Sequence, residues 1–117
     1  MGVWFLAIRQ ASSFDLVEAR RRLGLSQAQL ANALNVPVRT LQNWEVGKGV
    51  SQMAKKTGVL RDLLSRMDDY VVAPQEKEWL SSSLEAFGGR TPHQFIVEGR
   101  IRDIVIEFDR LREGQPV

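Results

Sequence analysis

Apolar residues recur along most of this chain with the three- and four-residue spacing of helices. Leu30, Ala31 and Leu34 show this spacing in the first half, and a longer set shows it from Phe95 to Leu111. The exception is the apolar, β-prone run Val3–Ile8, which is predicted to form a strand or an N-terminal arm. The pattern therefore predicts a nearly all-α protein.

Capping signals divide the first half into short helices. Ser12 or Ser13 is predicted to start a helix that ends at Gly24, because glycine favours the position after a helix. Ser26 and Gln29 form a capping box that opens a second helix, and the turn Asn35–Pro37 ends it. A third helix is predicted from Val38 to Val46.

The second half carries longer helical patterns. One helix is predicted over Gln52–Tyr70, with Gly58 as a weak point, and another over Glu76–Phe87 after a linker at Val71–Gln75. Gly88, Gly89 and Arg90 break the pattern. Thr91 and Pro92 then favour a new helix start, and the helical pattern continues to the end with a break at Gly99.

Composition and charge add two facts to this pattern. The 117 residues are 44% hydrophobic and include no cysteine, which excludes disulfides and thiolate sites and fits a reducing compartment. Residues 1–60 hold eight Lys/Arg and three Asp/Glu, a net charge of +5, whereas residues 61–117 hold eight and eleven, a net charge of −3. The two halves are therefore predicted to bind different partners, with a polyanion on the first.

Two short helices joined by a tight turn form a unit whose second helix can enter the major groove of DNA. The stretch from Arg20 to Gly49 resembles the Xre (Cro/CI-type) helix-turn-helix family. The residues that carry the resemblance are Leu23–Ala31, Val36, Thr40–Glu45, Gly47 and Lys48. Two departures are Pro37, where the family usually has a small hydroxyl residue, and Asn35, where it often has glycine.

The spacing within the third helix separates a core side from a reading side. Leu41 and Trp44 lie three residues apart and are expected in the core. The residues expected to face base edges are Val38, Arg39, Thr40 and Asn43. Arg39 and Asn43 on their own would be ordinary surface residues, and it is their position in the motif that favours DNA contact.

The family resemblance adds three further expectations for the first half. It implies that Gln27 touches a phosphate, and Lys48 is a candidate for a second phosphate contact. It also implies that Arg20 pairs with Glu45 and thereby links the first helix to the third.

The second half, from about Arg61, resembles the toxin-binding domain of Xre/MbcA/ParS-type antitoxins. The residues that carry this resemblance are Trp79–Leu80, Phe87–Pro92, Gly99 and Leu111–Gly114. The usual Pro and Asn before the paired glycines are missing, because Ser81–Ala86 stand there. The resemblance implies toxin contacts, for which the candidates are Arg90, Leu111, Arg112 and Glu113.

Several of these residues also have purely structural interpretations. Gly88, Gly89, Thr91 and Pro92 are expected to form a turn and a helix start. Residues 114–117 contain Gly and Pro, which cannot continue a helix, so they form either a projecting end that enters a toxin or a frayed terminus. His93, the only histidine, has no partner at metal-ligand spacing, so no metal site or cofactor is expected.

Together these features predict an N-terminal arm or strand (1–13), a five-helix-type helix-turn-helix domain (14–60) and a small helical toxin-binding and dimerisation domain (61–117). The predicted function is that of a non-enzymatic, homodimeric type II antitoxin in the bacterial cytoplasm. It would bind a palindromic operator in double-stranded DNA and a toxin, which the resemblance implies is often a RES-domain NAD-degrading enzyme. The alternatives are a stand-alone dimeric Xre-family repressor and a protein adaptor that no longer binds DNA.

Overall fold

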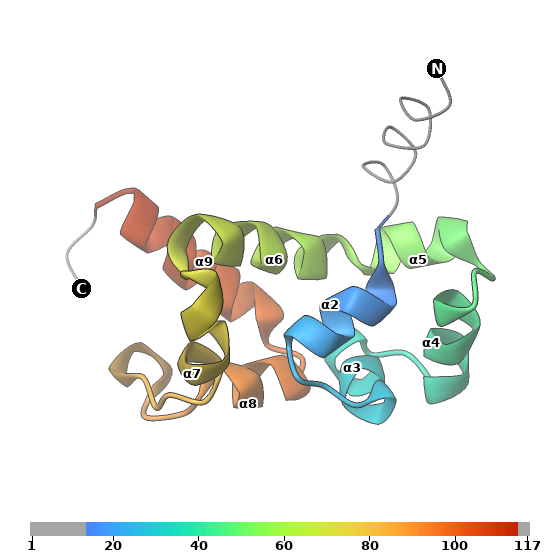
Figure 1. Cartoon of the computed structure of the whole chain (residues 1–117), viewed down its shortest axis with the longest axis horizontal. Coiled ribbons are helices and arrows are strands. Elements are labelled where there is room, and N and C mark those ends of the chain that lie inside the picture. The colour runs from blue at the N-terminus through green and yellow to red at the C-terminus, as the bar shows by residue number, and fades with distance from the viewer. Residues whose placement is uncertain (1–13, 115–117) are drawn as a thin grey trace, which may run out of the picture.

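The computed structural model describes residues 14–114, and every regular element in that range is helical. The elements are α2 (Leu16–Arg22), α3 (Gln27–Leu34), α4 (Val38–Glu45), α5 (Val50–Lys56), α6 (Gly58–Tyr70), η1 (Ala73–Gln75), α7 (Glu76–Leu80), η2 (Glu85–Phe87), α8 (Pro92–Val97) and α9 (Ile101–Arg112). Figure 1 shows their arrangement. The all-α prediction is confirmed, while the predicted strand or arm at Val3–Ile8 lies outside the described residues.

Local capping sets the ends of α2 and α3. Asp15 has extended backbone angles, and its side chain accepts a hydrogen bond from the Glu18 backbone amide at 3.0 Å. Helix α2 therefore begins at Leu16, and the predicted start after Ser12 or Ser13 was wrong. The predicted capping box of Ser26 and Gln29 is confirmed. Asn35 ends α3 with φ +56°, a left-handed conformation that asparagine tolerates.

The helix predicted over Gln52–Tyr70 is two helices. The break falls at Thr57, whose side chain is fully buried and whose hydroxyl donates to the Met53 carbonyl oxygen at 2.8 Å. A threonine hydroxyl bonded to the carbonyl four residues earlier bends a helix. The helical pattern predicted one continuous helix with a weak point at Gly58, and the interruption falls directly before that glycine.

The helix predicted over Glu76–Phe87 also ends early, at Leu80. The hydroxyls of Ser81 and Ser82 donate to the carbonyl oxygens of Lys77 (2.9 Å) and Glu78 (2.7 Å), which lets side chains replace backbone amides at the helix end. Leu84 is then extended and forms an isolated antiparallel bridge with Arg90.

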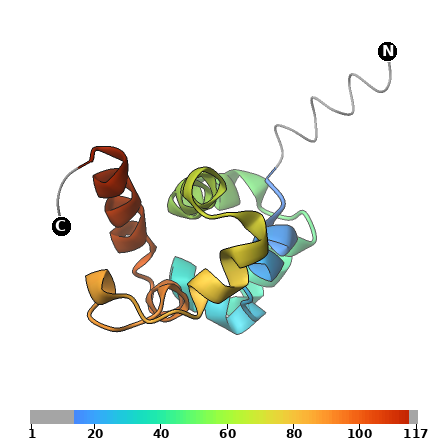
Figure 2. The same cartoon turned by 60° about the vertical axis from the view of Figure 1, so that its left-hand side comes forward.

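The hydrophobic core runs through both halves of the chain. On α6 and α9 the buried residues recur at helical spacing, and the two helices pack against each other, as Figures 1 and 2 show. These residues are Leu60, Leu63, Leu64 and Met67 on α6, and Ile101, Ile104, Val105 and Phe108 on α9. The side chains of α3 and α4 belong to the same buried cluster, and α3 packs against α8, so the second half supports the helix-turn-helix.

Polar contacts also join the two halves. Arg22 on α2 donates to Glu76 at 2.8 Å and to Asp68 at 2.6 Å, and the Asn32 side chain at the end of α3 donates to the Val97 carbonyl oxygen. The ion pair with Glu76 holds the pKa of Arg22 above its ordinary value. The predicted domain boundary between residues 60 and 61 falls inside α6, which begins at Gly58 and belongs to this shared core. The division into two domains stays a prediction.

None of the helices in residues 14–114 is long and apolar enough to cross a bilayer.

Two isoleucines on α9 provide a test of this packing. Ile104 is fully buried and Ile106 is 48% exposed. We expect Ile104→Ala to lower the free energy of unfolding by about 2–5 kcal/mol, because it leaves a cavity in the core. Ile106→Ala on the same helix is the matched control and should change it by about 0.5 kcal/mol or less. Equal effects of the two substitutions in urea denaturation would contradict this description of the core.

Candidate functional site

Helix α4 presents one side to the core and the other to solvent. Leu41 and Trp44 are buried, with exposed fractions of 0% and 4%, as the sequence predicted. Val38, Arg39 and Asn43 are exposed, which fits their expected place on the reading side. Thr40 is half-buried, so it lies at the edge of that side rather than within it.

Gln42 also lies on the exposed side of α4, although it was not among the residues predicted to face DNA. It lies one turn after Val38 and is exposed next to Asn43. The helical spacing from Val38 was a signal that could have identified it.

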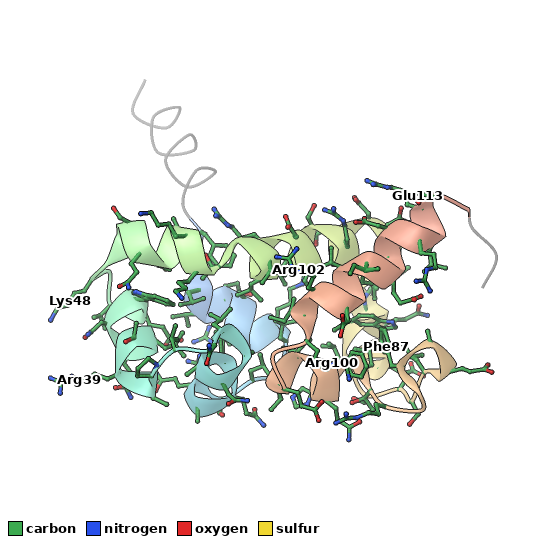
Figure 3. All side chains as sticks on the ribbon, turned by 180° about the vertical axis from the view of Figure 1, so that it is seen from behind. Arg39, Lys48, Phe87, Arg100, Arg102 and Glu113 are labelled. Carbon is green, nitrogen blue, oxygen red and sulfur yellow. The ribbon has the colours of Figure 1, made fainter. Side chains whose placement is uncertain are left out.

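Arg39 and Lys48 lie at one end of the molecule and point away from the ribbon (Figure 3). Lys48 belongs to the turn between α4 and α5, where Gly49 has φ +69°. A Cβ atom at Gly49 would lie 3.2 Å from Nε1 of Trp44, so this turn is packed tightly against the tryptophan. The packing fixes the backbone next to Lys48, while its side chain stays exposed.

A chain of polar side chains connects α2, α3 and α4. Arg20 donates through Nε to Glu45 Oε2 at 2.8 Å and through Nη1 to the Leu25 carbonyl oxygen at 3.2 Å. Gln27 Nε2 donates to Glu45 Oε1 at 2.8 Å, and Gln42 Nε2 donates to Gln27 Oε1 at 3.3 Å. We call Arg20, Glu45, Gln27 and Gln42 the polar chain. The expected contact between Arg20 and Glu45 is present, and Gln27 has two protein partners in addition to its expected role at a phosphate.

The polar chain determines the charge state of Glu45, whose side chain is only 7% exposed. Burial by itself would raise the pKa of this carboxyl group. The hydrogen bonds from Arg20 and Gln27 and the attraction of the Arg20 charge outweigh burial, and they hold the pKa of Glu45 below its ordinary value. Glu45 is therefore a carboxylate at neutral pH.

The turn before α8 has the predicted architecture. Gly88 and Gly89 have φ of +65° and +84°, values that favour glycine. Thr91 and Gln94 form a capping box, with bonds of 3.1 Å and 2.9 Å, and Pro92 is the first residue of α8. The structural interpretation of these four turn residues fits the geometry.

Arg90, a candidate for toxin contact, already has partners within the chain. It forms an ion pair with Glu98, and its guanidinium lies 5.8 Å from the ring centre of Phe95. Arg100 stacks more closely on the same ring, at 4.1 Å. The Arg90 side chain is 42% exposed, so it can still be reached from solvent.

The other toxin-contact candidates lie at the end of α9. Leu111 is 56% exposed and borders a small apolar hollow of about 140 Å³. The hollow is lined by Trp79, Leu84, Ala86, Phe87, Ile104, Glu107, Phe108 and Leu111. Arg112 lies 3.7 Å from Asp109 and is 59% exposed, and Glu113 is exposed just after the helix (Figure 3). The structure therefore brings Leu111, Arg112 and Glu113 together at one exposed helix end.

No metal-binding arrangement is found among residues 14–114, where no group of three His, Asp or Glu side chains is placed to hold an ion. His93 instead lies with Nε2 3.4 Å from the Gly24 carbonyl oxygen, between the two halves.

Comparison with protein families gives a match over α2 to the start of α6. The family model described as Helix-turn-helix matches residues 16–59, the segment that contains the polar chain and the exposed side of α4. Residues 16–59 are a helix-turn-helix domain.

Similarity extends over both halves of the chain in two further comparisons. The chain is 22% identical over 96 residues to the probable mycobacterial cidal antitoxin of Mycobacterium tuberculosis, covering 82% of this chain and 84% of that protein. It also has the fold of a chain in the crystal structure of the M. tuberculosis MbcT–MbcA toxin–antitoxin complex. That match has a TM-score of 0.54 and 18% identity, and it covers 86% of this chain and 93% of the other. The predicted resemblance to Xre/MbcA/ParS-type antitoxins is confirmed.

The lowered pKa of Glu45 predicts a pH-dependent part of the stability of the helix-turn-helix domain. A carboxyl group with a lower pKa in the folded state stabilises the fold above its unfolded pKa, and this contribution is lost as the pH falls through the folded pKa. Glu45→Gln keeps the shape of the side chain but removes this titration. We expect the wild type to lose more stability than Glu45→Gln between about pH 5 and pH 2. Thermal melts at several pH values test this, and parallel curves for the two proteins would contradict it.

Proposed function

We propose that this chain is a type II antitoxin that binds operator DNA through α4 and neutralises a toxin through its second half. The observation that carries the proposal is the similarity to an antitoxin along 82% of the chain, which includes residues beyond the helix-turn-helix domain. A stand-alone repressor would need only the matched segment 16–59 and a dimer contact.

The exposed side of α4 supports the DNA half of the proposal. Arg39 and Asn43 are exposed on one side of the helix. An arginine can form two hydrogen bonds with guanine, and an asparagine can form two with adenine. Val38, with Thr40 beside it, provides methyl groups that suit a thymine methyl. Lys48 and Gln27 are proposed to bind phosphates and so to position the helix. A two-fold dimer would place two such helices on a palindromic operator.

The DNA half predicts two kinds of variant. Arg39→Ala or Asn43→Ala should weaken binding to the preferred site by about 1–3 kcal/mol and relax the base preference. Lys48→Ala should weaken binding to every duplex and flatten the dependence on salt. Arg102→Ala, which removes an exposed charge from α9, is the matched control. It should leave the base preference and the salt dependence of binding unchanged. Fluorescence titrations at several salt concentrations provide the measurement. Wild-type affinity in both kinds of variant would show that α4 is not the reading helix.

The end of α9 supports the toxin half of the proposal. Leu111 offers an apolar side chain, and Arg112 and Glu113 offer charges, all exposed on a helix end that lies opposite α4 in Figure 1. An apolar anchor with charged neighbours suits insertion into a concave site of a partner. We propose that this end masks the toxin's active site and that Arg90 contributes a second contact. The proposed toxin is a RES-domain enzyme that degrades NAD.

Two truncations separate the helix end from the residues after it. Ending the chain after Arg110 removes Leu111, Arg112 and Glu113, whereas ending it after Gly114 keeps them. We expect only the shorter chain to lose protection when each is co-expressed with a RES-domain toxin that the full-length chain neutralises. Growth and cellular NAD content are the measurements. Full protection by the shorter chain would contradict masking by this helix end and leave Arg90 as the candidate contact.

A further inference from the structure

A pocket of about 620 Å³ lies between the helix-turn-helix domain and the second half of the chain. One wall is the end of α2 with the turn after it, and the other is built from α7 and the start of α8. We call it the junction pocket, and the lining residues that matter here are Arg21, Arg22, Leu23, Lys77, Leu80 and His93. Its volume lies within the range of small-molecule sites, about 300–1,000 Å³. In Figure 1, α7 and α8 lie on one side of α2 and α4 lies on the other, so the pocket is separate from the exposed side of α4.

The charge of the junction pocket is positive, because no Asp or Glu is among the described residues that line it. The charge of Arg22 is compensated by ion pairs with Glu76 and Asp68. Arg21 and Lys77 are exposed, and within residues 14–114 no carboxylate forms an ion pair with either of them. Two positive charges, one on each wall, therefore remain to attract an anion.

The rest of the lining combines a polar ring with apolar side chains. His93 reaches from the α8 side to the opposite wall, where its Nε2 lies 3.4 Å from the Gly24 carbonyl oxygen. Leu23 and Leu80 are buried, with exposed fractions of 0% and 5%, and contribute apolar surface to the pocket. Apolar surface with a few convergent polar groups is typical of small-molecule sites. A ligand with both an anionic part and an apolar part suits this lining.

We propose that the junction pocket binds a phosphate-bearing ligand of nucleotide size, with its phosphates between Arg21 and Lys77 and its apolar part against Leu23 and Leu80. A guanidinium can form two parallel hydrogen bonds with a phosphate, and a lysine ammonium adds a compact charge. A hollow with apolar lining suits a detached ligand better than the outer face of a duplex. Since the two walls belong to different halves of the chain, the bound ligand contacts both halves and stabilises their junction.

Calorimetric titration of the full-length protein with ADP at low salt tests the proposal. Arg21→Ala combined with Lys77→Ala removes both charges, and both residues are exposed, so the variant should fold. We expect its affinity for ADP to fall by about 10-fold or more, because charge-assisted hydrogen bonds are lost. Lys55→Ala combined with Lys56→Ala removes two exposed charges from α5 and is the matched control. It changes the net charge equally and should leave the affinity for ADP unchanged.

Inorganic pyrophosphate tests the apolar part of the pocket, since it carries a charge similar to that of ADP but has no nucleoside. We expect ADP to bind more tightly than pyrophosphate and to raise the melting temperature of the wild type, because a ligand that binds only the folded state stabilises it.

Several results would overturn the proposal. No binding of either probe at millimolar concentration would exclude a phosphate site, and equal losses in the two double variants would reduce the binding to general charge attraction. Equal affinities of the wild type for ADP and pyrophosphate would exclude a ligand of nucleotide size. If duplex DNA displaces ADP, and the Arg21 and Lys77 substitutions weaken duplex binding as much as ADP binding, the pocket is a contact for DNA phosphates instead.

Discussion

Glu45 places a negative charge at the end of α4 with only 7% of its side chain exposed, and the arrangement of the first three described helices depends on how that charge is compensated. A charge removed from water needs an opposite charge and hydrogen bonds, or it destabilises the fold. Arg20 comes from α2 and Gln27 from the first turn of α3, so compensating one carboxylate brings three helices together. The same carboxylate orients the amide of Gln42 on the exposed side of α4.

The second half of the chain supports this unit through apolar packing as well as through the ion pairs of Arg22 with Asp68 and Glu76. Helices α6 and α9 contribute large buried side chains to a cluster that includes Leu30 and Leu41 of the helix-turn-helix domain. At the turn before α9, Gly99 has φ +83°, and a Cβ there would lie 3.7 Å from the Ala33 carbonyl oxygen. The end of α3 and the turn before α9 are therefore in close contact, and α4 and the tip of α9 belong to one packed body at opposite ends (Figure 1).

Much of this arrangement could be predicted from the sequence, because it depends on local signals. The capping boxes of Ser26 and Thr91, the buried Trp44 and the helical patterns of α6 and α9 all follow from spacing. The break at Thr57 was foreshadowed only by the weak point at Gly58, and the break at Ser81 was not predicted, since both hydroxyls could equally have faced solvent within an unbroken helix. The contact between Gln42 and Gln27 was missed for a related reason. The two residues are 15 positions apart, and only the folded structure brings their amides together.

The exposed side of α4 differs from the rest of the helix-turn-helix domain in how freely it can change during evolution. Arg39 and Asn43 have no place in the buried cluster, whereas Leu41 and Trp44 on the same helix are part of it. Point mutations at the exposed positions can therefore leave the fold and the surface at the tip of α9 unchanged. If α4 binds DNA as proposed, a gene duplicate could acquire a new operator in this way and keep the partner proposed for the tip of α9.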